Sequence, residues 1–245
     1  MIEQATRVTD RGAKTPPGPP EGEDRPTHMT LAVVLQVREG RLRVLLWERA
    51  REPSAGLWAL PGGYLDARET LEACLRRHLA VKVDVRELSL LEQLETRSEP
   101  ERHPGEWQLA TAYLGLVPAD SDPELPADTA WHPVDALPRL AFDFEAFTLR
   151  GRERLRAKLS YTNIGFALAA RTFTLGELRD VYAAALGHRV SSTNLQRVLV
   201  RRGVLEAAGG RRASGPAGGR PPSLYRFRSR ELAITDPFAA LRPPS

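Results

Sequence analysis

The sequence predicts an α+β fold with two domains, a mixed α/β/α sandwich followed by a smaller domain of short helices and a β-hairpin. Three observations support this prediction. Apolar runs of strand length, separated by turn residues and one amphipathic helix, fill the first part of the chain. Two short helices with clear start and stop signals come next, followed by a glycine-rich hairpin. The two parts also differ in net charge.

Charge separates the second part of the chain from the first. Residues Gly151 to Arg230 include 16 Lys and Arg but four Asp and Glu, a net charge of +12. The whole chain of 245 residues carries +4, so the remainder carries −8. A general preference for arginine does not explain why acidic residues are missing from one third of the chain. The asymmetry predicts an acidic body joined to a basic module that binds nucleic acid.

Cysteine usage and hydropathy exclude several other classes of protein. Cys74 is the single cysteine, so there is no disulfide framework and no cysteine-based zinc site, and we expect a buried structural thiol. No apolar run approaches the roughly 18 residues that span a bilayer, and the N-terminus has no signal-peptide core. We therefore expect a cytoplasmic protein with no membrane partner.

The first domain is expected at residues 29–160, after a disordered N-terminal arm at 1–28. The arm contains TPPGPPEGEDRP and almost no aliphatic residues, so it cannot bury enough surface to offset the entropy of ordering it. Strands are predicted at 31–37 and 42–50, as a hairpin, and at 57–60, 88–96 and 107–117. A helix from Ala67 onward and an amphipathic helix at 144–159 complete the domain.

The stretch PGGYLDARETLEACLRRHLAVKVDV, residues 61–85, carries the spacing of a known motif. Gly63, Glu69, Arg77 and Leu79 fit the Nudix hydrolase box, G-x5-E-x7-R-E-U-x-E-E-x-G-U, where U is aliphatic. In that family a glycine turn enters a helix whose glutamates bind divalent cations over a diphosphate. Strand, glycine turn and helix follow one another here as the motif requires. The resemblance implies a Nudix-like α/β/α sandwich.

The second half of the box departs from the family pattern. His78 replaces one glutamate, Val81 and Lys82 replace the glutamate pair, and Asp84 replaces the last glycine. Carboxylates at i, i+3 and i+4 would share one helix face and form the oxygen site that Mg²⁺ requires. An imidazole, an isopropyl group and an ammonium group do not form such a site. The Lys82 charge would repel a cation about 4 Å away by roughly 4 kcal/mol near a surface. The sequence therefore predicts no metal site, no catalytic residues and no hydrolase activity.

The second domain, expected at 161–230 before a tail at 231–245, has the pattern of a winged helix-turn-helix. An apolar helix is predicted at 163–170. Thr174 and Glu177 then form a capping box for a helix that ends at Gly187. Ser192 is expected to cap a second helix ending at Gly203, which gives a helix-turn-helix. Residues 204–228 follow as strand, glycine-rich loop and strand, the pattern of a wing.

The chemistry of the second helix suits a recognition helix. Its N-terminal end is rich in side chains that can meet base edges or phosphates in the major groove, and arginines of the wing suit the DNA backbone. The candidate DNA-binding residues are Ser192, Thr193, Asn194, Gln196, Arg197, Arg201, Arg202, Arg211, Arg212 and Arg220.

A degenerate Nudix box followed by a basic winged helix ending in GRPPSLYRF resembles the Nudix-related regulators of NAD metabolism, the NrtR-type repressors. LAFDF at 140–144 and FTLGELRDVYAAALG at 173–187 are also similar to that family. The resemblance implies a homodimeric repressor on a palindromic double-stranded DNA operator near NAD biosynthesis or salvage genes. It implies ADP-ribose or a related NAD-derived nucleotide as effector, and no cofactor. The candidate effector-binding residues are Arg49, Arg51, Gly62, Gly63 and Glu69, the arginines because their guanidinium groups suit a diphosphate.

Two other functions stay open at the level of sequence. One is an active Nudix hydrolase of ADP-ribose or another nucleoside diphosphate, with Glu69, Glu72 and His78 as irregular metal ligands. Metal-dependent release of AMP from ADP-ribose would establish it. The other is an RNA-binding or scaffolding protein, which a preference for single-stranded RNA over duplex DNA would reveal.

Overall fold

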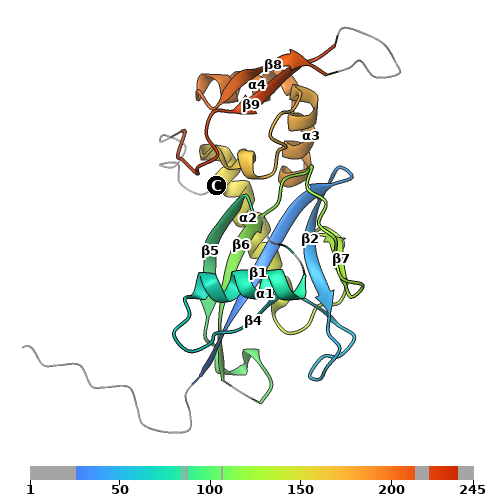
Figure 1. The fold of residues 1–245 in the computed structure, drawn as a ribbon, viewed down its shortest axis with the longest axis vertical. Helices are drawn as coiled ribbons and strands as arrows, with labels where there is room; N and C mark the ends of the chain where they lie inside the picture. Colours follow the sequence, from blue (N-terminus) through green and yellow to red (C-terminus); the bar gives the residue numbers. More distant parts are fainter. Residues whose placement is uncertain (1–25, 84, 86–87, 106, 213–220, 237–245) are drawn as a thin grey trace, which may run out of the picture.

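The structure is a computed structural model that describes residues 26–83, 85, 88–105, 107–212 and 221–236. A seven-stranded sheet with its flanking helices forms one end of the molecule, and a small helical unit with a two-stranded sheet forms the other (Figure 1). None of the helices in this described part combines the length and apolarity that crossing a bilayer requires.

The large sheet is built around β1, a strand of 12 residues that pairs with three neighbours. The main path runs β3-β2-β1-β6-β5, while β4 pairs with β1 and β7 pairs with β2. Only the β1 and β6 pair is parallel within this sheet. The strands are β1 (Thr27–Arg38), β2 (Arg41–Glu48), β3 (Trp58–Ala59), β4 (Gly62–Tyr64), β5 (Leu90–Arg97), β6 (Gln108–Leu116) and β7 (Thr129–Pro133).

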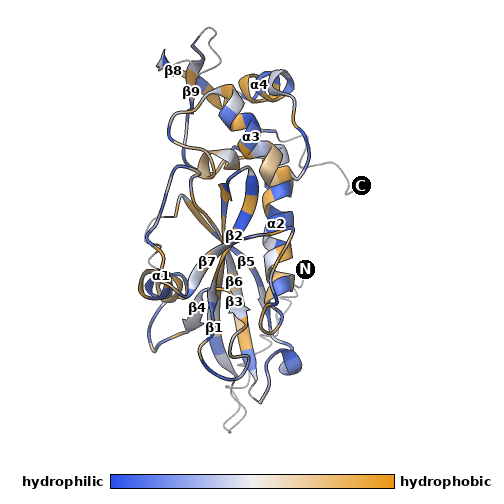
Figure 2. Ribbon diagram, turned by 90° about the vertical axis from the view of Figure 1, so that its right-hand side faces the viewer, coloured by the Kyte–Doolittle hydropathy of each residue, from blue (hydrophilic) through white to orange (hydrophobic). Residues whose placement is uncertain are grey.

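Alternation along β1 explains the three layers. Leu31 and Val33 point to the face covered by α2 (Phe144–Tyr161), whereas Ala32 and Val34 point to the face covered by α1 (Leu71–Lys82). The two helices lie on opposite sides of the sheet (Figure 2). A strand covered on both faces is a continuous apolar run, as β1 is from Leu31 to Leu35. The predicted α/β/α sandwich is confirmed.

The beginning of α1 differs from the expectation. The helix begins at Leu71 rather than at Ala67, and the Thr70 side chain caps it by accepting from the Ala73 backbone N–H. Arg68 has a φ of 64°, in the left-handed region, so the backbone before Thr70 is a turn and not helix. The single cysteine, Cys74, is buried in α1 as predicted.

The helical unit is a winged helix-turn-helix, as predicted. The capping box between Thr174 and Glu177 is present, and Gly187 ends the first helix with a φ of 78°. Its elements are α3 (Leu175–Leu186), α4 (Ser192–Arg201), β8 (Leu205–Arg211) and β9 (Ser223–Phe227), with β8 and β9 antiparallel.

Two local predictions in this unit were wrong. Ser191 caps α4, because its side chain accepts from the Asn194 backbone N–H, and Ser192 is the first helical residue. The apolar stretch at 163–170 forms only a short 3₁₀ helix, η2 (Ile164–Ala167), with all four residues buried. Burial on every side explains its uniform apolarity, which the sequence pattern alone could not separate from a helix.

One hydrophobic core runs through both ends of the molecule. It begins on the α2 face of the sheet, continues through η2 and α3, and reaches Leu199 of α4 and Phe227 of β9. The Ala119 backbone N–H, after β6, donates to the Leu168 carbonyl oxygen at 2.8 Å. The helical unit is therefore packed onto the sheet rather than tethered to it.

Candidate functional site

The box turn forms one wall of a cavity of about 630 Å³. Backbone and side chains of β4 and α1 face the loop after β2, a loop at 102–105 and the N-terminal end of α2 across it. Arg49 enters from the β2 loop, and Phe142 and Phe144 enter from the α2 side. The volume lies within the usual range for small-molecule sites.

Arg77 is held by two carboxylates at the edge of this cavity. Its guanidinium donates to Glu69 through Nε at 2.9 Å and Nη2 at 2.7 Å, and Nη2 also lies 2.9 Å from Asp66. The hydrogen bonds from Arg77 lower the pKa of Glu69 to about 2. The Glu69 carboxylate therefore stabilises the turn before α1, and Glu69 is not among the residues that line the cavity.

His78 and Lys82, four residues apart, both point from α1 toward β4. The His78 Nε2 lies 3.2 Å from the Tyr64 carbonyl oxygen, and the Lys82 ammonium donates to the Gly62 carbonyl oxygen at 2.8 Å. Val81, expected on the same face, is instead 78% exposed. Burial lowers the pKa values of both His78 and Lys82. One wall of the cavity therefore carries an imidazole and an ammonium group.

The donor set does not fit a divalent cation. Within the described residues, no three His, Cys, Asp or Glu side chains form a group that could hold a metal. Glu72 points to Arg76, which donates to it at 3.0 Å, while Glu69 is held by Arg77. The irregular ligand set of Glu69, Glu72 and His78 thus has its carboxylates bound elsewhere. Mg²⁺ would need several oxygen ligands around one point.

Two cations that line the cavity have no carboxylate partner among the residues that the structure describes. The Arg49 Nε donates to the Pro53 carbonyl oxygen at 3.0 Å, and its guanidinium carbon lies 5.0 Å from the Phe142 ring centroid. The Lys82 Nζ lies 4.9 Å from the Trp47 ring centroid. After burial, the nearby Arg49 charge is the further cause that lowers the pKa of Lys82. Among the described residues, no ion pair joins either cation to an acid.

The glycines of the turn are required by close packing. A Cβ on Gly62 would lie 2.0 Å from the Thr30 carbonyl oxygen, and one on Gly63 would lie 2.3 Å from the His78 ring. Both glycines line the cavity together with Arg49. Arg51 is exposed and does not line it. Of the five candidate effector-binding residues, the structure brings together Arg49, Gly62 and Gly63.

The exposed side of α4 gathers most of the candidate DNA-binding residues of the helix. Leu195 and Leu199 are buried against α3 and β8, and the opposite side is polar. The Arg197 Nη2 donates to the Asn194 side-chain oxygen at 2.8 Å. Thr193, Asn194, Arg197 and Arg201 are exposed, whereas Ser192 and Gln196 are half-buried.

The remaining arginines fall into three groups. Arg211 and Arg212 are exposed at the end of β8, where Arg212 pairs with Glu177 at 3.2 Å. Arg220 lies outside the described residues. Arg202 does not point to solvent: its side chain is 11% exposed and binds the Ser160 carbonyl oxygen and the Asp236 carboxylate. These contacts make Arg202 a structural link between α4 and the end of α2.

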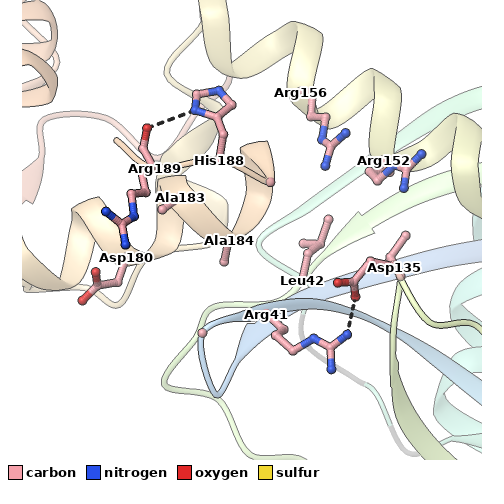
Figure 3. A pocket seen from close by; sticks show the side chains of 13 residues that line it. Arg41, Leu42, Asp135, Arg152, Arg156, Asp180, Ala183, Ala184, His188 and Arg189 are labelled. Atoms are coloured by element: carbon pink, nitrogen blue, oxygen red, sulfur yellow. Dashed lines mark hydrogen bonds and ion pairs between the residues drawn. The ribbon is translucent and has the colours of Figure 1, made fainter. Parts of the chain in front are cut away.

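A second cavity, of about 500 Å³, lies at the seam between the sheet and α3 (Figure 3). Arg152 and Arg156 of α2 line it, together with Arg41, which donates to Asp135 at 2.7 Å. The Arg156 Nε donates to the Ala185 carbonyl oxygen near the end of α3. Sequence reasoning missed this seam, because only the i, i+4 spacing of the two α2 arginines hinted at it.

Comparison with known proteins fits both halves of this arrangement. The family described as NUDIX domain matches residues 26–150, and the family described as NrtR DNA-binding winged helix domain matches residues 165–227. The crystal structure of Shewanella oneidensis NrtR complexed with a 27mer DNA is 31% identical, with a TM-score of 0.69. The similarity covers 82% of this chain and 93% of that one.

The chain belongs to the NrtR family. Another relative of this NrtR-family protein is the ADPR responsive transcriptional repressor NtrR of Acinetobacter baylyi, 29% identical over 211 residues that cover 83% of each chain. The crystal structure of a MutT/nudix family protein from Enterococcus faecalis is 22% identical, with a TM-score of 0.66. The similarity covers 84% of this chain and 89% of that one. At that identity it shows the shared fold alone.

Proposed function

We propose that this NrtR-family protein is a transcriptional repressor that senses ADP-ribose or a related NAD-derived nucleotide. The proposal is carried by one observation: a cavity lined by cations, with no metal-binding group among the described residues, shares a continuous core with a basic winged helix. The relatives support it, because one is described as an ADPR responsive repressor and another was crystallised with DNA. Its targets would be NAD biosynthesis or salvage genes, and its place of action the cytoplasm.

The cavity offers complementary parts for such a nucleotide. Gly62 and Gly63 lie in the cavity wall, so the backbone of the turn forms part of the surface that a ligand would meet. The Arg49 guanidinium suits a diphosphate because it presents paired donors in a plane. The rings of Phe142 and His103, 4.7 Å apart, offer an aromatic surface for a base.

The winged helix offers a complementary surface for DNA. In this proposal the exposed side of α4, with Asn194, Arg197 and Arg201, enters the major groove, and Arg211 and Arg212 of the wing contact backbone phosphates. A homodimer would place two such helices on the half-sites of a palindromic operator. We assign the sensing role to residues 29–160 and the DNA-binding role to residues 161–230.

We further infer that the nucleotide is bound and not hydrolysed. The box helix lacks the glutamates at 78, 81 and 82, and the two carboxylates left near the turn are bound to Arg77. A sensor that destroyed its ligand would erase the signal it reports. Incubation with ADP-ribose and Mg²⁺ or Mn²⁺ should release no AMP above the level seen without protein. Release that is lost on Glu69→Gln would instead establish the hydrolase.

The decisive experiment is fluorescence anisotropy with labelled duplex DNA from upstream of the NAD genes of the source organism. We expect the protein to bind this DNA tightly even in the presence of excess random DNA, and we expect ADP-ribose to weaken the binding. Arg197→Ala should weaken operator binding about 5- to 150-fold, since a good base contact contributes roughly 1–3 kcal/mol. The control Arg76→Ala also removes one arginine charge, but from α1 and far from α4, and should leave operator affinity nearly unchanged. Unchanged affinity in Arg197→Ala and Arg201→Ala would reject the assigned recognition surface.

A further inference from the structure

Lys82 occupies the place in the box where the spacing calls for a metal-binding glutamate, and its ammonium reaches back across the cavity wall. The ammonium donates to the Gly62 carbonyl oxygen at 2.8 Å. The Nζ atom also lies over the Trp47 ring, and the Trp47 Nε1 in turn donates to the Leu60 carbonyl oxygen at 3.2 Å. These contacts fix the position of the Lys82 ammonium group at the cavity wall.

The ammonium group retains unused binding capacity. It has three N–H donors, and the Gly62 carbonyl oxygen accepts one of them. No second acceptor for Lys82 is found among the described residues, and the residue lines the cavity. Apart from its contact with the Trp47 ring, the ammonium therefore has donor capacity for a ligand that enters there.

Arg49 makes the local charge excess larger. Its charge is close enough to lower the pKa of Lys82, after the larger effect of burial, so the two cations repel each other across the cavity. The carboxylates that line the cavity do not relieve this repulsion, since Asp66 is bound to Arg77 and Glu52 is exposed. A ligand carrying two negative charges would relieve it, as a Mg²⁺ ion could not.

We propose that the Lys82 ammonium takes the place of the divalent cation and, with Arg49, binds the diphosphate of the nucleotide, so that effector binding requires no metal. This inference rests on the proposed function, because it concerns the same cavity. It assigns to Lys82 a binding role that replaces the role of a metal ion instead of merely blocking one. The affinity for the nucleotide then depends on a fixed protein charge and not on the cellular concentration of Mg²⁺.

The first test uses the full-length wild-type protein. Isothermal titration with ADP-ribose in EDTA and again in millimolar Mg²⁺ should give dissociation constants equal within about twofold. Binding that disappears in EDTA and returns with Mg²⁺ would overturn the inference while leaving the sensing function intact. Absence of binding in both conditions would reject ADP-ribose as effector. ADP as a second probe then separates the two failures, because the diphosphate site predicts that ADP still binds without metal.

The second test removes the charge. Lys82→Met keeps an unbranched side chain but removes the charge. It should weaken ADP-ribose binding about 10- to 150-fold in EDTA, because a hydrogen bond to a charged group contributes roughly 1.5–3 kcal/mol. Arg76→Met removes one charge from the same helix outside the cavity and should stay within about twofold of wild type. Arg49→Met should weaken binding as Lys82→Met does. Wild-type affinity in both pocket variants would overturn the inference.

Discussion

Leu199→Ala tests whether the two ends of the molecule unfold together. Leu199 lies on α4, is 1% exposed, and belongs to the core that continues to the sheet. Truncating a fully buried leucine costs about 2–5 kcal/mol, because both the transfer of the side chain and the remaining cavity contribute. In a protein of this size each kcal/mol lowers Tm by about 2–4 °C. A cost of about 3 kcal/mol therefore predicts a Tm roughly 6–12 °C lower.

The tryptophans make the assay specific to the distant end. All four, Trp47, Trp58, Trp107 and Trp131, lie in the sheet domain, so their fluorescence reports on the sheet and not on α4. Thermal unfolding followed by tryptophan fluorescence and by far-ultraviolet circular dichroism should shift by the same amount in Leu199→Ala. Such a shift means that a cavity in the winged helix lowers the stability of the sheet.

A neighbouring residue supplies the control. Val200 is 52% exposed on the same helix, so Val200→Ala should change the free energy of unfolding by less than about 0.5 kcal/mol. If the fluorescence transition of Leu199→Ala coincides with that of wild type while the dichroism transition moves, the winged helix unfolds on its own. That result would refute the view that one core joins the domains.

Two further predictions concern the box turn. Gly63→Ala should weaken ADP-ribose binding, because the added methyl would lie 2.3 Å from the His78 ring and push the ring into the cavity. The double variant Gly63→Ala/His78→Ala should recover the affinity for ADP-ribose in the same titration. If it does not, the substitution distorts the turn itself. Glu69→Gln should lower the urea midpoint at pH 7, since the folded-state pKa of about 2 lies below the ordinary 4.5. The contribution of Glu69 is present above pH 4.5 and is lost as pH falls toward 2, so the gap between variant and wild type should narrow over that range. A gap that stays constant with pH would reject the Arg77 brace as its cause.

The sequence predicted the elements whose signals are local. The continuous apolar run LAVVLQV predicted β1, and the Thr174 capping box with Gly187 predicted both ends of α3, because strand runs, caps and turns depend on adjacent residues. Adjacent candidates were harder to separate. Ser191 and Ser192 are both good caps, and the approach of the backbone to α4 decides between them.

Side-chain direction was less predictable than the position of the elements. Residues 78, 81 and 82 satisfy the spacing of one helix face, yet the packing of α1 turns His78 and Lys82 inward and leaves Val81 in solvent. Arg202 resembles its neighbour Arg201 in sequence, but contacts more than 30 residues away along the chain bury it. Such contacts depend on tertiary packing, which no local pattern encodes.

The helix α2 connects the cavity that we propose for the nucleotide with the winged helix. Its first residue, Phe144, lines the cavity, and its N-cap residue Asp143 is held at 2.8 Å by Arg102, which also lines the cavity. With 18 residues it extends about 27 Å. Near its other end, Arg156 donates to the Ala185 carbonyl oxygen of α3. A nucleotide that repositions Phe144 or Arg102 therefore acts on one end of a helix whose other end contacts the DNA-binding unit.

The free energy that such coupling needs is small. A nucleotide can change operator affinity only by the difference between its affinities for the two arrangements of the protein. A tenfold change in operator affinity requires about 1.4 kcal/mol. One hydrogen bond contributes about 0.5–1.5 kcal/mol to stability, so the bond between Arg156 and Ala185 is of the required size. A shift of α2 that makes or breaks a few such contacts is sufficient, and the domains need not separate or expose their common core.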